Sequence, residues 1–187
     1  MRKTVLLLVL VAALSAIANA ELISLHPSAT TVPLGTPLSV DVMVSGFSDL
    51  YAWQFDIDFN PAILSATNVT EGALFSSIGV GFSPGFIDNV GGSVTFIGDS
   101  LSGPGPGVNT DGTLATITFD TIGVGLATID LANVILLDSN LNDITATISG
   151  TSVTVTAASG VPEPSTFSLL LPVLAGIGFG IRRRLVR

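Results

Sequence analysis

The chain of 187 residues contains no cysteine. A disulfide framework, a thiolate metal site and a thiol nucleophile are therefore excluded. A domain built from this sequence must be held together by a hydrophobic core. The many Val, Ile, Leu and Phe residues can supply such a core at this size.

Basic residues are missing from residues 21–160, because all six Lys and Arg lie in the first three or the last six positions. The same stretch contains all but one of the 14 acidic residues. Nucleic acid is excluded as a partner, since nothing in this stretch could neutralise phosphates. Its carboxylates must instead be solvated, bonded to backbone amides or neutralised by cations.

Groups suited to catalysis are scarce. The single histidine, His26, stands beside Pro27, and the sequence does not suggest a buried serine next to it for a catalytic triad. Asp56 and Asp58 share one face of a strand, and a glycoside hydrolase uses a pair of carboxylates. Exposed strands commonly carry acids at this spacing, so we predict no enzyme and keep a glycoside hydrolase as a remote alternative.

The N-terminus has the pattern of a secretory signal peptide. Arg2 and Lys3 form a positive start, residues 5–14 are apolar, and Ala18 and Ala20 form a small-residue cleavage site. We expect residues 1–20 to be removed during export. The alternative is an uncleaved N-terminal anchor.

Three different segments follow one another at the C-terminus. Residues 158–166 form a proline-containing linker, and residues 167–181 are uncharged. A helix of these 15 residues would be about 22 Å long, short against a bilayer core of about 30 Å but extended by its flanks. Residues 182–187 form a basic tail that should remain cytoplasmic. We therefore predict a single transmembrane helix, and the adjoining arginines disfavour a buried core helix.

This order resembles the PEP-CTERM sorting signal. The residues that carry the resemblance are Val161, Pro162, Glu163 and Pro164 in the linker, and Arg182, Arg183 and Arg184 in the tail. The resemblance implies recognition by an exosortase, a membrane cysteine transpeptidase of Gram-negative bacteria that make extracellular polysaccharide. The two prolines hold Glu163 in an extended backbone, which suits a protease substrate. A proline-rich linker before an ordinary anchor is the alternative.

Residues 21–157 have the alternation of β-strands. Inward-facing Trp53, Phe55, Ile57 and Phe59 alternate with Gln54, Asp56 and Asp58, which we expect to face outward. Val40, Val42 and Val44 alternate similarly. Further strands are predicted at residues 64–69, 81–88, 93–99, 113–121, 127–131, 134–137 and 151–156, and residues 103–107 should form a mobile surface loop. The pattern predicts one all-β domain, an antiparallel β-sandwich of about nine strands.

The order of these strands resembles that of cohesin domains. Residues 32–42, 50–61 and 111–119 carry the resemblance best, whereas residues 75–107 match poorly. The resemblance implies a nine-stranded jelly roll related in fold to carbohydrate-binding modules. It also implies binding of a dockerin, a small calcium-loaded helical module, through one sheet. No individual contact residue can be transferred from the family.

One stretch has the start of a calcium-binding loop, with Asp138, Asn140 and Asn142 at its first, third and fifth positions. It lacks the glycine of position six and the glutamate of position twelve, where Ser149 stands. The stretch is therefore not an EF-hand, and a turn between strands is the preferred interpretation. Calcium is the one cofactor that remains possible. Other acids that could join such a site are Asp88, Asp99 and Asp111. The sequon Asn68-Val69-Thr70 is interpreted as a chance match.

Together these features predict an exported, non-catalytic binding module. We expect an inner-membrane-anchored intermediate that exosortase processes, followed by release to the surface or extracellular matrix of a Gram-negative bacterium. The predicted partner is a dockerin-like protein or extracellular polysaccharide. The alternative is a structural matrix or biofilm protein without a discrete partner.

Overall fold

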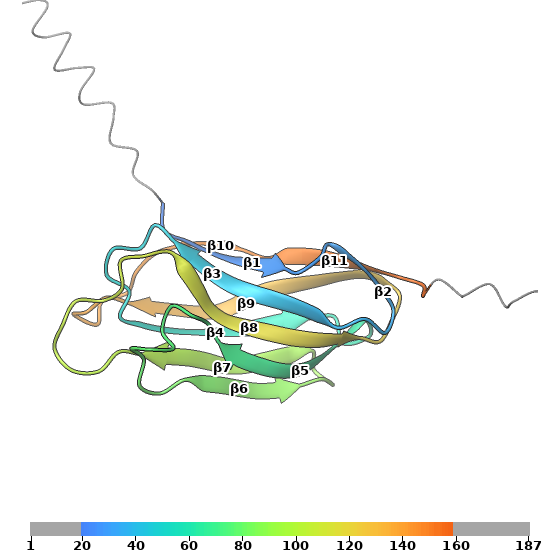
Figure 1. Cartoon of the computed structure of the whole chain (residues 1–187), viewed down its shortest axis with the longest axis horizontal. Helices are drawn as coiled ribbons and strands as arrows, with labels where there is room; N and C mark the ends of the chain where they lie inside the picture. Colours follow the sequence, from blue (N-terminus) through green and yellow to red (C-terminus); the bar gives the residue numbers. More distant parts are fainter. Residues whose placement is uncertain (1–19, 159–187) are drawn as a thin grey trace, which may run out of the picture. The chain divides into compact units, whose positions relative to one another are not determined.

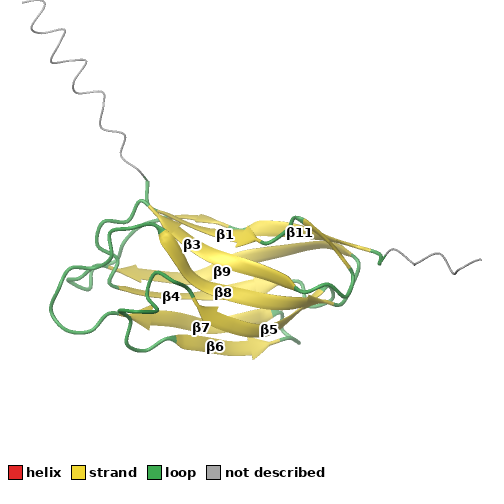
Figure 2. Ribbon diagram, viewed as in Figure 1, coloured by secondary structure: helices red, strands yellow, loops and turns green. Residues whose placement is uncertain are grey.

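The computed structural model describes residues 20–158, which fold into two packed β-sheets (Figure 1). No helix occurs in this part of the chain, and within it nothing helical could cross a membrane (Figure 2). The prediction of an all-β sandwich is confirmed. The strands are β1 (Leu22–Pro27), β2 (Thr31–Pro33), β3 (Leu38–Ser45), β4 (Ala52–Phe59), β5 (Leu64–Glu71), β6 (Ser83–Asp88), β7 (Ser93–Ser100), β8 (Gly112–Thr121), β9 (Gly125–Leu137), β10 (Thr147–Ser149) and β11 (Thr151–Thr156).

The five-stranded sheet has the order β10-β1-β3-β8-β5, and the six-stranded sheet has the order β2-β11-β9-β4-β7-β6. Neighbours are antiparallel except for the pairs β1–β10 and β2–β11, which are parallel. The described residues contain eleven strands, whereas about nine were predicted. Two of the eleven, β2 and β10, have only three residues each. Such short strands show no period-two pattern, so the sequence did not predict them.

The chain changes sheets between β10 and β11 at Gly150. A Cβ atom added there would lie 2.2 Å from Oδ1 of exposed Asp130 and 3.0 Å from the Ile129 carbonyl oxygen, so a larger residue would require the Asp130 side chain to move. From this crossing β11 runs to the end of the six-stranded sheet where Val155 pairs with Gly125, and there the chain leaves the described residues (Figure 1).

The core lies between the sheets and follows the predicted alternation. In β3 every second side chain is buried, and in β4 Trp53, Phe55, Ile57 and Phe59 are buried. The Trp53 and Phe55 rings stack with centroids 5.2 Å apart. Phe59 of the six-stranded sheet meets Phe119 of the five-stranded sheet edge to face, also at 5.2 Å. These rings connect the two layers.

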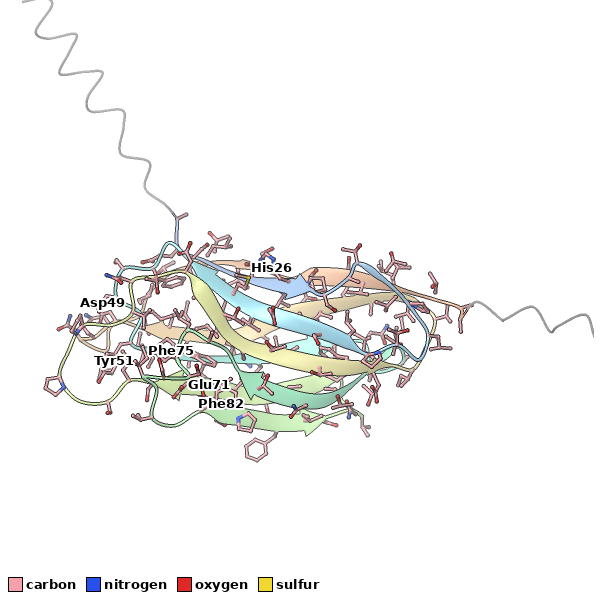
Figure 3. The ribbon with its side chains drawn as sticks, in the orientation of Figure 1. His26, Asp49, Tyr51, Glu71, Phe75 and Phe82 are labelled. Atoms are coloured by element: carbon pink, nitrogen blue, oxygen red, sulfur yellow. The ribbon has the colours of Figure 1, made fainter. Side chains whose placement is uncertain are left out.

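A segment between β5 and β6 carries the chain from one sheet to the other. Phe75 in this segment is fully buried, with its ring edge-on to Trp53 at 6.1 Å, and Phe82 lies 6.3 Å from the same ring. Figure 3 places Phe75 and Phe82 near Glu71, at the end of β5. The crossing segment therefore covers this end of the core.

The loop that contains residues 103–107 lies on the surface, as the glycines and prolines indicated. It is attached at two points. The Tyr51 hydroxyl donates to the Gly103 carbonyl at 2.6 Å, and the Gly107 N–H donates to Asp49. Its predicted mobility stays a prediction.

Candidate binding surface

The outer face of the six-stranded sheet carries large apolar side chains in contact with solvent. Phe86 of β6 is 73% exposed, Phe96 of β7 is 56% exposed, and Ile135 of β9 is 45% exposed. The two phenylalanine rings meet edge to face at 6.4 Å. Exposed apolar groups that gather on one face are typical of a recognition surface.

A shallow hollow of about 420 Å³ lies beside these rings. Phe96, Ile135 and Gln54 contribute to its lining, together with Ala52, Trp53, Gly81, Ser83, Gly98, Asp99, Ser100 and Leu137. Gly98 has no side chain to fill the space, and an added Cβ would lie 2.8 Å from the Trp53 carbonyl oxygen. The hollow could receive one side chain of a partner.

The outer face of the five-stranded sheet differs in chemistry. Asp41, Thr116 and Thr70 lie opposite one another across β3, β8 and β5. The Thr116 hydroxyl donates to Asp41 at 2.6 Å, and the Thr70 hydroxyl donates to the Thr116 carbonyl at 3.4 Å. These two hydroxyl groups of the mostly polar face are thus bonded within the sheet. Of the two outer faces, the six-stranded one offers apolar area for burial.

Two β-bulges shape the apolar face, one on each neighbour of the central strand β4. On β7, Thr95 and Phe96 stand opposite the single residue Asp56. On β9, Asn133 and Val134 stand opposite Phe55. Phe96 and Asn133 have φ angles of 61° and 47°, in the left-handed region that L-residues rarely adopt. The second bulge also explains why two predicted strands are one 13-residue strand, β9.

Asp56 and Asp58 were both predicted to be exposed to solvent. The prediction is wrong for Asp56. Asp56 is only 7% exposed, whereas Asp58 is exposed. Oδ1 of Asp56 accepts from the Phe96 N–H at 2.8 Å, and Oδ2 accepts from the Asn133 side-chain amide at 2.7 Å. The bulges enclose the carboxylate from both sides. The two aspartates therefore have different surroundings and do not form a matched pair.

A second acidic pair, which the sequence did not predict, joins the two sheets. Burial and the nearby carboxyl of Asp99, through hydrogen bonding and charge, raise the pKa of Glu71. Asp99 is 6% exposed, and its Oδ1 accepts from the N–H groups of Gly81 and Ser100. Within residues 20–158, its Oδ2 is buried and has no hydrogen-bond partner. A protonated Glu71 can supply the missing donor.

We expect Glu71→Gln to stabilise the domain near neutral pH. Because the pKa of Glu71 is raised in the folded state, the folded domain loses stability as rising pH removes this proton. The glutamine keeps a donor for Asp99 at every pH, so the melting temperature should rise by about 3 °C at about pH 7 and change little at about pH 4. Thermal melts check this, with exposed Asp120→Asn as the control for net charge. An equal gain at both pH values would contradict the explanation.

The loop of Asp138, Asn140 and Asn142 forms a closed turn. Oδ1 of Asp138 accepts from the N–H groups of Asn140 and Asn142, each at 2.8 Å, and Oδ2 accepts from the Asn142 side-chain amide at 2.9 Å. The bond from the Asn142 side chain is the main cause that lowers the pKa of Asp138. These bonds agree with the preferred interpretation of a turn between strands.

The acids that could have joined a calcium site lie elsewhere. The strand register places Asp88 at the opposite end of the sheet, Asp111 accepts from the Gly46 N–H, and Asp99 faces Glu71. Asp49 reaches the loop instead, and its Oδ2 accepts from the Ser139 hydroxyl at 2.7 Å. This bond is the main cause that lowers the pKa of Asp49. Within residues 20–158 no three acidic or histidine side chains are arranged to hold a metal ion.

Calcium binding at Asp138 is the less favoured possibility, and titration calorimetry tests it. Because the Asp138 oxygens already accept three hydrogen bonds, we expect no heat and no shift in melting temperature at millimolar calcium. Magnesium is the control ion. Saturable heat that disappears in Asp138→Asn would show that calcium displaces these bonds.

His26 and Asn68 both lie on the surface. Nε2 of His26 is 3.0 Å from the Ser24 hydroxyl, and the ring is exposed on β1. Asn68 is exposed on β5 next to a bulge in the pairing with β8. The residues of the signal peptide, among them Ala18, lie outside the described part, which begins at Ala20. The sorting residues Val161–Pro164 and Arg182–Arg184 lie outside it as well.

The fold and the surface together define a class of protein: a jelly-roll sandwich module with one apolar and one polar outer face. The sequence profile of the Cohesin domain matches residues 23–156, most of the chain. The chain belongs to the cohesin family. Cohesin domains are binding modules. The profile of the PEP-CTERM protein-sorting motif matches residues 160–184, so the chain combines a cohesin domain with an export-linked sorting tail.

Solved structures agree with this assignment. A type II cohesin domain from the cellulosome of Acetivibrio cellulolyticus has a TM-score of 0.61 at 15% identity, covering 73% of this chain and 95% of its own. The sixth cohesin of scaffoldin B from the same organism, solved in complex with a Cel5 dockerin mutant, has a TM-score of 0.60 at 17% identity, with 74% and 100% covered.

A non-cellulosomal cohesin from Archaeoglobus fulgidus has a TM-score of 0.61 at 14% identity, with 74% and 92% covered. At such identities the likeness establishes the fold alone. A search of curated proteins found no match.

Proposed function

We propose that this protein is a surface-sorted cohesin that binds a dockerin-like module through the outer face of its six-stranded sheet. The observation that carries the proposal is the group of Phe86, Phe96 and Ile135, which are large, apolar and exposed on neighbouring strands. Aromatic side chains of this kind provide much of the binding energy at protein interfaces. The adjoining hollow offers space for one anchoring side chain.

Charge indicates the character of the partner. Residues 21–160 carry acids and no Lys or Arg, so every cation in the interface must come from the other protein. A partner with basic residues around an apolar centre would be drawn toward this surface and oriented on it. We expect the association rate to fall as salt concentration rises.

Extracellular polysaccharide remains the second candidate partner. It is favoured by the hydroxyl-rich outer face of the five-stranded sheet, where Thr67 and Thr70 donate to carbonyl oxygens of β8 and Thr116 donates to Asp41. The exposed aromatic rings on which a sugar could stack lie on the other sheet, which weakens this candidate. A matrix protein without a discrete partner would bind neither kind of ligand.

Binding of defined probes separates these functions. The full chain, purified in detergent and immobilised, is exposed to purified dockerin modules encoded in its source genome and to purified extracellular polysaccharide of the same organism. We expect saturable binding of at least one dockerin that is lost when Phe96 and Ile135 are both changed to Ser. Saturable binding of polysaccharide alone would replace the proposed partner, and binding of neither probe would favour a matrix protein.

We further propose that the tail acts as a temporary anchor. The matched PEP-CTERM motif supports processing by exosortase at the membrane of a Gram-negative bacterium, and the mature product would be the acidic sandwich. Within that motif, Glu163 lies between two prolines, which favour the extended backbone that suits a protease substrate.

The tail proposal predicts that Glu163→Gln prevents release. The surface form of the native protein should lack residues 167–187 by mass spectrometry, whereas the variant should stay in the membrane fraction at full length. Glu21→Gln is the control, since it also removes one carboxylate but lies outside the motif. A native surface form that retains residues 167–187 would contradict the proposal.

A further inference from the structure

The composition of the apolar face depends on the two bulges beside β4. In β7 the inward-facing residues are Val94 and Ile97, both fully buried, and their separation by three positions breaks the period of two. Without the extra residue, alternation from Val94 would turn Phe96 toward the core. The bulge therefore places Phe96 on the outer face.

The bulge in β9 has the same effect on Ile135. Ala127 and Ile129 are fully buried, and continued alternation would place Ile135 inside and Leu136 outside. The structure shows the reverse, with Leu136 3% exposed and Ile135 45% exposed. Phe96 and Ile135, two of the three apolar residues of the candidate surface, are thus displaced from the core side by one inserted residue each.

One buried side chain is bonded to both inserted segments. The carboxylate of Asp56 accepts from the backbone of Phe96 with one oxygen and from the side chain of Asn133 with the other. Phe96 and Asn133 are the positive-φ residues of the two bulges. A bulky residue such as phenylalanine holds a left-handed backbone only when its surroundings compel it. The chain has no Lys or Arg nearby in sequence to neutralise this carboxylate, so these two donors are its main support.

A further contact supports Phe96 from the edge strand. The Ser83 hydroxyl of β6 donates to the Phe96 carbonyl at 3.0 Å. The N–H of Phe96 is thereby bonded toward β4 and its carbonyl toward β6. β4 lies between β7 and β9, and among the described residues Asp56 is the one side chain bonded to both bulges.

We propose that Asp56 is a positioning residue that determines which apolar side chains the outer face presents. Its carboxylate holds the inserted residues of β7 and β9, and so keeps Phe96 and Ile135 outside and Leu136 inside. The consequence for partner binding rests on the proposed function, whereas the consequence for strand register does not.

Cysteine labelling measures the register directly, because the chain has no cysteine of its own. Ile135→Cys and Leu136→Cys reporters are made separately in the full chain, purified in detergent, and reacted with a maleimide. With Asp56 intact we expect the Ile135→Cys reporter to react at least about tenfold faster than the Leu136→Cys reporter. In the Asp56→Ala background the ratio should fall to about one or below, with slower labelling at position 135 and faster labelling at position 136.

Two variants separate positioning from general stability. Asp56→Asn keeps an acceptor for Phe96, and its amide can donate to the Asn133 oxygen once that side chain turns over, so the parent ratio should return. Asp58→Ala removes an exposed carboxylate from the same strand and should leave the ratio unchanged. Faster labelling at both positions in Asp56→Ala would indicate general loosening and would overturn the proposal, as would an unchanged ratio.

A second measurement covers the case in which a reporter does not fold. In the cysteine-free Asp56→Ala variant, the Cα and Cβ chemical shifts of Phe96 and Asn133 should change from left-handed toward extended values. Unchanged shifts would contradict the proposal. Dockerin binding is measured in parallel. If Asp56→Ala shifts the register but no form of the protein binds a dockerin, the proposed function alone is refuted. If the protein binds a dockerin but Asp56→Ala leaves the register unshifted, this inference alone is refuted.

Discussion

Phe96→Asp is expected to reduce affinity for the dockerin partner by about 100-fold or more while the domain stays folded. Phe96 is 56% exposed, so its ring adds little to the core, and aspartate tolerates a left-handed φ better than phenylalanine does. In the complex the new carboxylate would be desolvated at the centre of an apolar contact, which lowers the affinity. Loss of one central aromatic residue typically costs about 2–4 kcal/mol of binding free energy.

The matched control for this change is Thr118→Asp, which places the same charge on the outer face of the five-stranded sheet. Titration calorimetry gives both dissociation constants, and thermal melts show whether each variant is folded. An equal loss of affinity in both variants would point to general charge repulsion. Full affinity in Phe96→Asp would place the partner elsewhere.

Phe119→Ala is expected to have the largest effect on stability, a loss of about 3–5 kcal/mol in the free energy of unfolding. Phe119 is fully buried in β8 and meets Phe59 of β4 across the sandwich. Alanine would leave a cavity between the two sheets where the rings now join them. Without disulfides or buried Lys and Arg ion pairs in this domain, apolar packing of this kind is its main source of stability.

Phe86→Ala makes the identical chemical change at a residue that is 73% exposed, and it should cost less than about 1 kcal/mol. Urea unfolding curves of both variants give the comparison. Similar losses in the two would mean that Phe119 contributes no more to the core than a surface ring does.

The sequence predicted most strands because one buried face imposes a period of two. The alternation from Trp53 to Phe59 identified β4 and its inward face correctly. The short strands β2 and β10 were not predicted, since three residues carry too little pattern. The N-terminal strand β1 was also not recognised.

The candidate surface was not predictable in the same way. Phe96 and Ile135 look like core residues when only alternation is considered, and bulges on two neighbouring strands place them outside. One signal was present in the sequence: Val94 and Ile97 are separated by three positions, which breaks the period within a strand. The pairing of Glu71 with Asp99 left no such signal, because these residues come from different sheets.

The sequence by itself determined the cohesin fold, the sorting tail and a domain without cations, because these depend on composition, local alternation and a linear motif. The tertiary structure decided which face is apolar. That choice depends on where Asp56 finds its hydrogen-bond donors, and those donors come from strands 40 and 77 residues further along the chain. Contacts between such distant positions form only in the folded sheet.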